Sequence, residues 1–138
     1  MNLFHLAFDI ALHAHMGQKD KQGQPYIFHP VAVANQFTDE DRQVVALLHD
    51  VVEDTDITLK TLSLSFPAHI VNAVDAITHR KGESNDDYIL RCAKDAMATD
   101  VKRKDIAHNS GRLAGIGDAE TIERLQRKYK RSLLLLNR

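Results

Sequence analysis

The sequence predicts an all-α protein, and three observations support that fold class. The 138 residues include only 6 Gly and 3 Pro, so few residues interrupt regular structure. Apolar residues recur at spacings of three and four along most of the chain, as they do on one face of a helix. The sustained alternation of apolar and polar residues that marks a half-buried strand does not occur. We therefore expect a compact bundle of roughly seven or eight helices in a single domain, residues 1–138.

The N-terminal third predicts one helix followed by a long ordered loop. Apolar residues at helical spacing begin at Leu3, and the helix is expected to end near Gly17. The next stretch, 18–30, contains one Gly and two Pro and no helical pattern, so it is predicted to be a loop.

Two further helices are predicted before residue 55. A short helix covers 31–37. Thr38, followed three residues later by Asp41, resembles a capping box that opens a third helix, which runs to about Asp54.

The later helices are predicted mainly from residues that favour helix starts. These starts are Thr58 for a helix over 59–65, Pro67 for one that runs to about residue 78, Ser84 for one over 85–98, and Asp118 for the last helix. Between the last two, a helix carries Asp105 and Asn109 and is followed by a Gly-rich loop.

Composition and charge exclude several classes of protein. Apolar residues form 43% of the chain and charged residues 27%, as in globular proteins with a true core. The net charge of −1 offers no general attraction for nucleic acid or an anionic membrane, so neither is expected as a partner. A single cysteine and the lack of a signal-peptide pattern predict a cytoplasmic protein.

A cluster of ionisable residues stands near the end of the third predicted helix. His49-Asp50 is followed one turn later by Glu53-Asp54, which places two i,i+4 pairs on adjoining faces. Three carboxylates so close together repel one another, and a divalent cation would offset that repulsion. In isolation, the same residues fit equally well as the solvated polar end of a helix.

Four ordered blocks of sequence place this cluster in a wider pattern. They read Ala14-His15-x-Gly17-Gln18, Gly23-x-Pro25-Tyr26-Ile27-x-His29-Pro30-x-x-Val33-Ala34, Ala46-Leu47-Leu48-His49-Asp50-Val51-Val52-Glu53-Asp54-Thr55 and Asp105-x-x-His108-Asn109. Together they resemble the hydrolase domain of RelA/SpoT-type alarmone enzymes, which belongs to the HD phosphohydrolase superfamily. The resemblance implies the compact multi-helix HD-domain fold. Because no synthetase domain fits in this length, it also implies a stand-alone small alarmone hydrolase, which removes the 3′ pyrophosphate of guanosine tetra- and pentaphosphate.

The resemblance further implies that one manganese ion is bound by His29, His49, Asp50 and Asp105. Two imidazoles and two carboxylates form a mixed nitrogen and oxygen ligand set, which suits Mn²⁺ or Fe²⁺ and also admits other divalent transition metals. Four protein ligands leave positions for water and a substrate oxygen, and the ion would convert that water to the hydroxide that attacks phosphorus. For each ligand, a purely structural role is the alternative.

The remaining candidate residues are judged against the same resemblance. Glu53 and Asp54 match an acidic pair of the family and are expected to orient water or carry its proton. Asn109 matches a substrate-facing position, and Lys21 keeps the family's residue next to Asp20. Arg112 lies in Ser110-Gly111-Arg112-Leu113, which departs from the family's Met-Arg-Thr-Leu, and is a candidate phosphate contact. A phosphorylated nucleotide is the expected partner. The other two histidines of the quoted blocks, His15 and His108, are expected to support the site by hydrogen bonds.

Two departures from the family pattern affect specificity and packing. Asp20 stands where the family usually has an Arg that stacks on guanine, so the chain is expected to discriminate less among bases; the alternative is that Asp20 only turns the loop. Arg103-Lys104 replaces an apolar pair before Asp105 and must be exposed or paired with acids.

These departures leave two alternative functions open. One is an HD phosphohydrolase acting on another nucleotide or phosphate ester, and the other is a catalytically weak alarmone-binding regulatory protein. The sequence predicts neither an oligomeric state nor the metal loaded in the cell.

Overall fold

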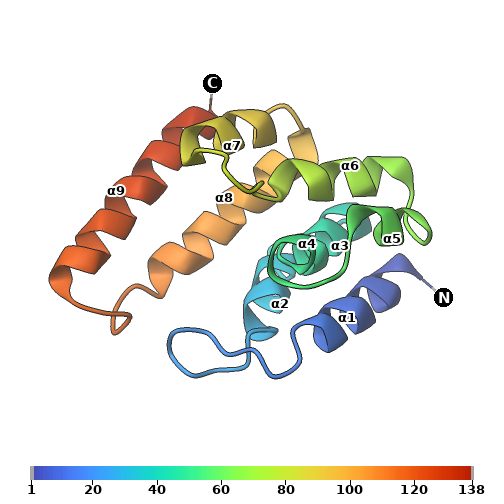
Figure 1. The fold of residues 1–138 in the computed structure, drawn as a ribbon, viewed down its shortest axis with the longest axis horizontal. Coiled ribbons are helices and arrows are strands. Elements are labelled where there is room, and N and C mark those ends of the chain that lie inside the picture. Colours follow the sequence, from blue (N-terminus) through green and yellow to red (C-terminus); the bar gives the residue numbers. More distant parts are fainter. Residues whose placement is uncertain (1, 138) are drawn as a thin grey trace.

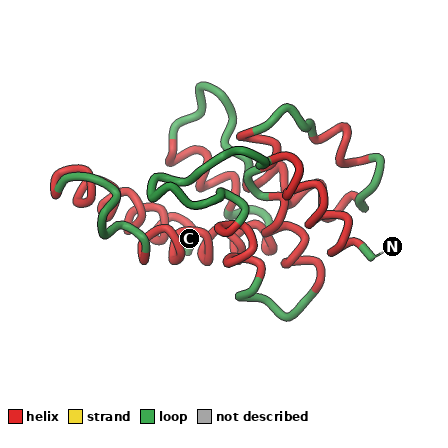
Figure 2. The backbone as a smooth tube through the Cα atoms, turned by 90° about the horizontal axis from the view of Figure 1, so that it is seen from below, coloured by secondary structure: helices red, strands yellow, loops and turns green. Residues whose placement is uncertain are grey.

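The computed structural model describes residues 2–137, and this part of the chain is built of helices joined by loops (Figures 1 and 2). Its helices are α1 (Leu3–Ala14), α2 (Phe28–Ala34), α3 (Glu40–Leu48), α4 (Val51–Asp54), α5 (Leu59–Ser63), α6 (Ala68–Ile77), α7 (Asn85–Cys92), α8 (Ala96–Gly111) and α9 (Ala119–Leu136). No strand forms within residues 2–137, where an isolated bridge joins Lys19 to Pro25. The all-α prediction is therefore confirmed. None of the described helices has both the length and the apolar character needed to cross a membrane.

Helix α3 lies at the centre of the fold. It packs against α1, α2, α6 and α8, and the five consecutive residues 44–48 at its C-terminal end are all buried. In Figure 1, α1 to α5 lie on one side of the molecule, while α8 and α9 run side by side on the other. Burial of apolar surface contributes about 25 cal/mol per Å², so this central helix anchors the groups that follow it.

The third predicted helix is interrupted in the structure. Helix α3 ends at Leu48, and α4 begins at Val51. In a continuous helix the Ala46 carbonyl would accept the Asp50 N–H. Here that carbonyl instead accepts hydrogen bonds from the N–H of His49, at 3.4 Å, and from its Nδ1, at 2.5 Å. The prediction of one helix through Asp54 was therefore wrong, because a histidine side chain takes the acceptor that the helix needs.

Most of the predicted helix starts are confirmed. Thr58, Ser84 and Asp118 each cap a helix by accepting a hydrogen bond from a backbone N–H three residues later, and α6 begins directly after Pro67. The start of α3 is a correction: Asp39, not Thr38, is the N-cap residue, and its side chain accepts the N–H of Arg42 at 3.1 Å.

Two other helix boundaries differ from the prediction. The single helix predicted over 85–98 is two helices, because the Asp95 side chain accepts the Ala98 N–H at 2.9 Å and starts α8 there. Helix α2 begins at Phe28, earlier than expected, since a proline in the first turn gives up no helical hydrogen bond. This early start places Pro30 and the adjacent His29 inside the helix.

A single arginine fixes the loop between α6 and α7. Arg91 donates from Nε and Nη2 to the two carboxylate oxygens of Glu83, both at 2.9 Å, and also donates to the carbonyls of Asp75 and Thr78. The hydrogen bonds from Arg91 lower the pKa of Glu83 to about 2. The charged form of Glu83 is therefore stabilised in the folded state.

We expect Glu83→Gln to lower the free energy of unfolding by about 1–2 kcal/mol at pH 7, since it removes a charge-assisted pair. The folded pKa lies below the unfolded value of about 4.3, so this contribution is complete above that value and is lost as pH falls toward 2. Denaturant unfolding at pH 7 and pH 2.5 measures it. The exposed pair Glu123 and Arg127 supplies the control, Glu123→Gln, which should change stability by less than about 0.5 kcal/mol. An equal loss for both variants would contradict this account.

Candidate active site

The four predicted metal ligands come from three separate elements and meet at one point. His29 lies in α2, His49 and Asp50 form the break between α3 and α4, and Asp105 lies in α8. Asp105 Oδ1 is 2.8 Å from Nε2 of His29 and 3.3 Å from Nε2 of His49. Asp50 Oδ2 is 3.0 Å from Nε2 of His49 and 3.8 Å from Nε2 of His29. Four potential ligand atoms therefore face one another inside the protein.

The protonation of His49 shows that this arrangement suits a cation. Its Nδ1 contacts the Ala46 carbonyl, which can only accept, so Nδ1 carries a hydrogen. Its Nε2 is buried without a hydrogen-bond partner in the described structure, although carboxylate oxygens of Asp50 and Asp105 lie close by. A nitrogen lone pair facing two carboxylates requires a proton or a metal ion between them. The residues present therefore fit a divalent transition metal, and His29, His49 and Asp105 form a group with metal-ligand spacing.

Two neighbouring side chains hold the carboxylates. Lys102 Nζ lies 2.9 Å from Oδ2 of Asp105, and the Tyr26 hydroxyl donates to Oδ2 of Asp50 at 2.5 Å. Burial alone would raise the pKa of Asp105, but Lys102, the contact with His29 and the nearby His49 hold it well below its usual range. For Asp50, the positive charge of the adjacent His49, 3.0 Å away, and the hydrogen bond from Tyr26 likewise outweigh burial and lower the pKa to about 2. Both carboxylates are therefore ionised. Neither Tyr26 nor Lys102 was assigned a role from the sequence.

The two supporting histidines occupy different places. His29 Nδ1 lies 2.7 Å from Nδ1 of His108, and the two rings are stacked. Partial burial and the charge of His29 lower the pKa of His108, so its neutral ring accepts this hydrogen bond and leaves Nε2 of His29 facing the carboxylates. His15 is buried and pairs with Gln18 at 2.9 Å, and Gln18 in turn donates to the Asp54 carbonyl.

Glu53 and Asp54 lie in α4, beside the four converging residues rather than among them. Glu53 Oε1 accepts the backbone N–H of His79 at 2.9 Å, which fixes its carboxylate. Partial burial, together with the negative charges of Asp50 and Glu53, raises the pKa of Asp54 to about 6. Asp54 can therefore exchange a proton near neutral pH. His79 also stacks its ring on that of Tyr88, with the ring centroids 4.6 Å apart.

Lys21, Asn109 and Arg112 line one cavity of about 370 Å³. We name it the nucleoside cavity after the partner expected from the sequence; its lining also includes the apolar Leu125 and Tyr129. The three predicted substrate residues are thus brought together. Tyr129 was missed by sequence reasoning, because nothing in its helix indicates which face meets a cavity.

Asp20 has contacts of the kind expected from a loop-forming residue. Its Oδ1 accepts the backbone N–H groups of Gln22 and Gln24, both at 2.9 Å, and its Oδ2 lies 3.3 Å from Nη1 of Arg112. Arg112 also donates to Oδ1 of Asn109 at 2.7 Å. The interpretation of Asp20 as a loop-turning residue therefore describes its contacts, and it also holds Arg112 at the rim of the nucleoside cavity.

The Arg103-Lys104 pair beside Asp105 is accommodated at the surface. Arg103 donates to Asp100 at 3.3 Å and to Asn137 at 2.7 Å, and Lys104 is exposed. These contacts match the expectation that both residues are exposed or paired, and they leave Asp105 buried on another face of α8.

Comparison with known families assigns the chain to one of them. Residues 7–111 match the HD domain family. The chain belongs to that family. The matched part of the HD domain contains all four converging residues and both acids of α4, whereas Arg112 and the whole of α9 lie beyond it.

Several relatives of this HD domain have curated names. The mouse guanosine-3′,5′-bis(diphosphate) 3′-pyrophosphohydrolase MESH1 is 46% identical over 83 residues, which cover 54% of this chain and 46% of that protein. A Synechocystis probable guanosine-3′,5′-bis(diphosphate) 3′-pyrophosphohydrolase is 34% identical over 139 residues, covering 90% of this chain and 18% of its relative. A Mycobacterium leprae probable GTP pyrophosphokinase is 35% identical over 122 residues, 79% of this chain and 16% of that protein. The chain thus spans less than half the length of each of these relatives.

The fold of this HD domain also matches a solved structure. That structure is described as a metazoan ortholog of SpoT that hydrolyzes ppGpp and plays a role in starvation responses. The TM-score is 0.87 at 26% identity, and the match covers 99% of this chain and 86% of the other. The likeness therefore includes α9, which the family match leaves out.

Metal binding to the four converging residues should release a proton. Burial lowers the pKa of His49, but the charges of Asp50 and Asp105 outweigh it and raise that pKa well above its usual value in the ion-free protein. Below this raised pKa the proton must leave before a metal binds, so we expect Mn²⁺ binding to release about one proton per ion at pH 7 and to weaken as pH falls. Calorimetry in two buffers of different ionisation enthalpy measures the proton count. His69→Ala, at an exposed histidine, should not change it, and a heat of binding that is the same in both buffers would contradict the assignment.

Proposed function

We propose that this HD domain is a metal-dependent phosphohydrolase that removes the 3′ pyrophosphate of guanosine tetraphosphate or pentaphosphate. The observation that carries this proposal is the convergence of two imidazole nitrogens and two carboxylates beside the nucleoside cavity. The names of the mouse and Synechocystis relatives and the ppGpp-hydrolysing protein of the same fold support the choice of substrate.

In this proposal His29, His49, Asp50 and Asp105 hold one divalent ion. Their mixed nitrogen and oxygen chemistry favours Mn²⁺, with Fe²⁺ as the nearest alternative. When bound, such an ion supplies positive charge that makes water more acidic and offsets the charge of the phosphate. Lys102, Tyr26 and His108 keep the ligand atoms oriented.

The acids of α4 carry out the proton transfers. Hydrolysis consumes one water, breaks the bond between phosphorus and the ribose 3′ oxygen, and delivers a proton to that oxygen. Asp54, whose pKa is about 6, is largely ionised at neutral pH, so it accepts the proton of the attacking water and can pass it on. Glu53 is fixed by the His79 N–H and leaves its second oxygen to orient the water.

The nucleoside cavity accommodates the rest of the substrate. Lys21 provides a positive charge for the 5′ phosphates, and Asn109 provides hydrogen-bonding groups for the sugar. The Tyr129 ring provides a flat face on which a purine can stack. Since Asp20 holds Arg112 here, Arg112 contributes its charge from a fixed position.

The direct test is turnover of guanosine tetraphosphate by the purified Mn²⁺-loaded protein. We expect guanosine 5′-diphosphate and pyrophosphate in equal amounts, loss of activity on chelation, and its return when Mn²⁺ is restored. Asp105→Asn should abolish both metal retention and turnover. Turnover of other nucleotides or p-nitrophenyl phosphate without turnover of the tetraphosphate would favour a different substrate, and tight binding of the tetraphosphate without turnover would favour a regulatory role.

Replacing either acid of α4 by its amide should separate chemistry from metal binding. We expect Glu53→Gln and Asp54→Asn each to lower kcat by about 10²- to 10⁴-fold while metal content stays near one ion per chain. Because Asp54 must be ionised to accept a proton, wild-type kcat should rise as pH increases through about 6, and this limb should vanish in Asp54→Asn. Asp56→Asn, at an exposed acid two residues away, is the matched control. Loss of metal from both amide variants would instead make these residues ligands.

A further inference from the structure

A second, smaller cavity lies next to the metal ligands, on another side from Lys21 and Arg112. It has a volume of about 110 Å³ and lies among α4, α7, α8 and α9. Its lining includes the acids Asp50 and Glu53 and the lysines Lys102 and Lys128. Tyr129 lines both this cavity and the nucleoside cavity, so its ring lies between them. We call the smaller cavity the Lys128 pocket.

Most polar groups of the Lys128 pocket already have partners. Lys102 is paired with Asp105 at 2.9 Å, and Glu53 accepts the His79 N–H. Asn85 donates to Oγ of Ser132 at 3.1 Å. These contacts satisfy the polar groups named, while Asp50 and Glu53 keep their negative charges; of the two lysines, Lys102 has a carboxylate partner.

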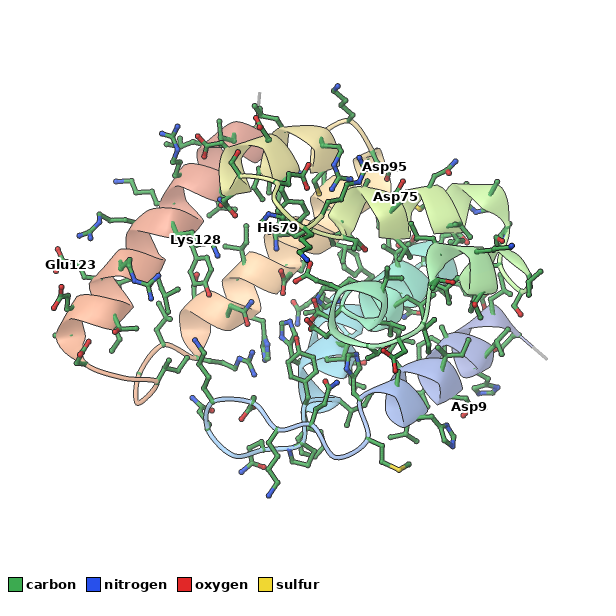
Figure 3. The ribbon with its side chains drawn as sticks, viewed as in Figure 1. Asp9, Asp75, His79, Asp95, Glu123 and Lys128 are labelled. Carbon is green, nitrogen blue, oxygen red and sulfur yellow. The ribbon has the colours of Figure 1, made fainter. Side chains whose placement is uncertain are left out.

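The second lysine of the pocket is Lys128. Within residues 2–137, Lys128 forms no ion pair or hydrogen bond. In Figure 3 its side chain extends from α9 toward the part of the molecule that carries His79, which also lines the pocket. Lys128 is exposed over part of its surface. Desolvation of the remainder and the positive charges of Lys102 and Arg124 lower its pKa, against the opposite effect of Glu53 and Asp105. An anion in the pocket would reverse this unfavourable environment.

We propose that the Lys128 pocket binds the outer phosphate of a diphosphate whose inner phosphate lies at the metal ligands, with Lys128 as its main cationic contact. Asp50 is both a wall of the pocket and one of the four converging residues, so a diphosphate can reach from one to the other. The inference rests on the proposed function for the identity of the whole substrate. It adds a binding residue on α9, outside the part of the chain that matches the HD domain family.

This assignment also orients the substrate. The base and 5′ phosphates occupy the nucleoside cavity, and the leaving pyrophosphate occupies the Lys128 pocket, with Tyr129 between the two. A monophosphate has no outer phosphate and does not need Lys128. The pocket therefore distinguishes a diphosphate ester from a simple phosphate ester.

Binding of inorganic pyrophosphate to the Mn²⁺-loaded protein tests the site without turnover. Calorimetric titration should show that Lys128→Met weakens pyrophosphate binding by about ten- to hundredfold, as expected for loss of a charge-assisted contact. Lys128→Arg, which keeps the charge, should recover most of the affinity. Lys130→Met makes the same change of charge on the same helix, at a second exposed lysine that does not line the pocket, and it should bind like the wild type. Equal affinity in Lys128→Met and wild type, or an equal loss in Lys130→Met, would overturn the proposal.

Kinetics separate this proposal from the proposed function. With guanosine tetraphosphate, Lys128→Met should raise KM by about tenfold or more, whereas KM for guanosine 3′-monophosphate should stay within about twofold of the wild-type value. An equal rise of KM for both substrates would overturn the pocket assignment. If the wild type turns over neither guanosine compound but binds pyrophosphate through Lys128, the proposed substrate fails while the pocket stands.

Discussion

Two imidazole nitrogens and two carboxylate oxygens face one another inside the protein. Much of the surrounding structure compensates the charges of these four groups or keeps them in place. The shortest separations are 2.8 Å between His29 and Asp105 and 3.0 Å between His49 and Asp50. Removing such groups from water is costly unless positive charge is present among them. Lys102 supplies one ammonium group, at Oδ2 of Asp105, on the side away from the histidines. The remaining positive charge must come from protons or a metal ion at the centre itself.

The same constraint shapes the backbone. His49 can present Nε2 to the carboxylates only if its Nδ1 is fixed elsewhere, and the Ala46 carbonyl provides that acceptor. Because that carbonyl is then not free for the Asp50 N–H, the helix does not continue through Asp50. Helix α3 ends, and α4 begins as a separate short turn. Glu53 and Asp54 lie in the short helix that begins after this break. The side-chain bond that orients one ligand therefore also helps to position the two acids.

Sequence reasoning picked out the four residues that converge but not all of their surroundings. His29, His49, Asp50 and Asp105 could be found because they occur in ordered blocks whose spacing resembles that of a known family. Most helix starts were also predictable, since N-cap bonds span only three residues. The break after Leu48 could not be predicted, because it depends on which carbonyl accepts the hydrogen bond from Nδ1 of His49.

The contributions of α9 were not predictable for a different reason. Lys128 and Tyr129 face the two cavities only because α9 packs against α7 and α8. No local pattern in the sequence encodes that docking. For Asp20 the sequence left two roles open, a change in base specificity or a turn in the loop. Its bonds to the Gln22 and Gln24 N–H groups, rather than its charge, determine its place in the loop.

Helix α8 connects these parts of the site. Lys102, Asp105, Asn109 and Arg112 are spaced at three, four and three residues, so they share one face of the helix. Lys102 faces the Lys128 pocket, Asp105 meets the other three converging residues, and Arg112 lines the nucleoside cavity. At 1.5 Å per residue this face is about 15 Å long, and hydrogen bonds run along it from Asp105 through Asn109 to Arg112. A face that is both polar and partly buried has no apolar periodicity, which is why the burial of α8 could not be predicted from hydrophobic spacing. Its buried residues are the apolar Ala98, Val101 and Ile106 together with Thr99 and Asp105, so one charged group of the site is buried beside apolar neighbours.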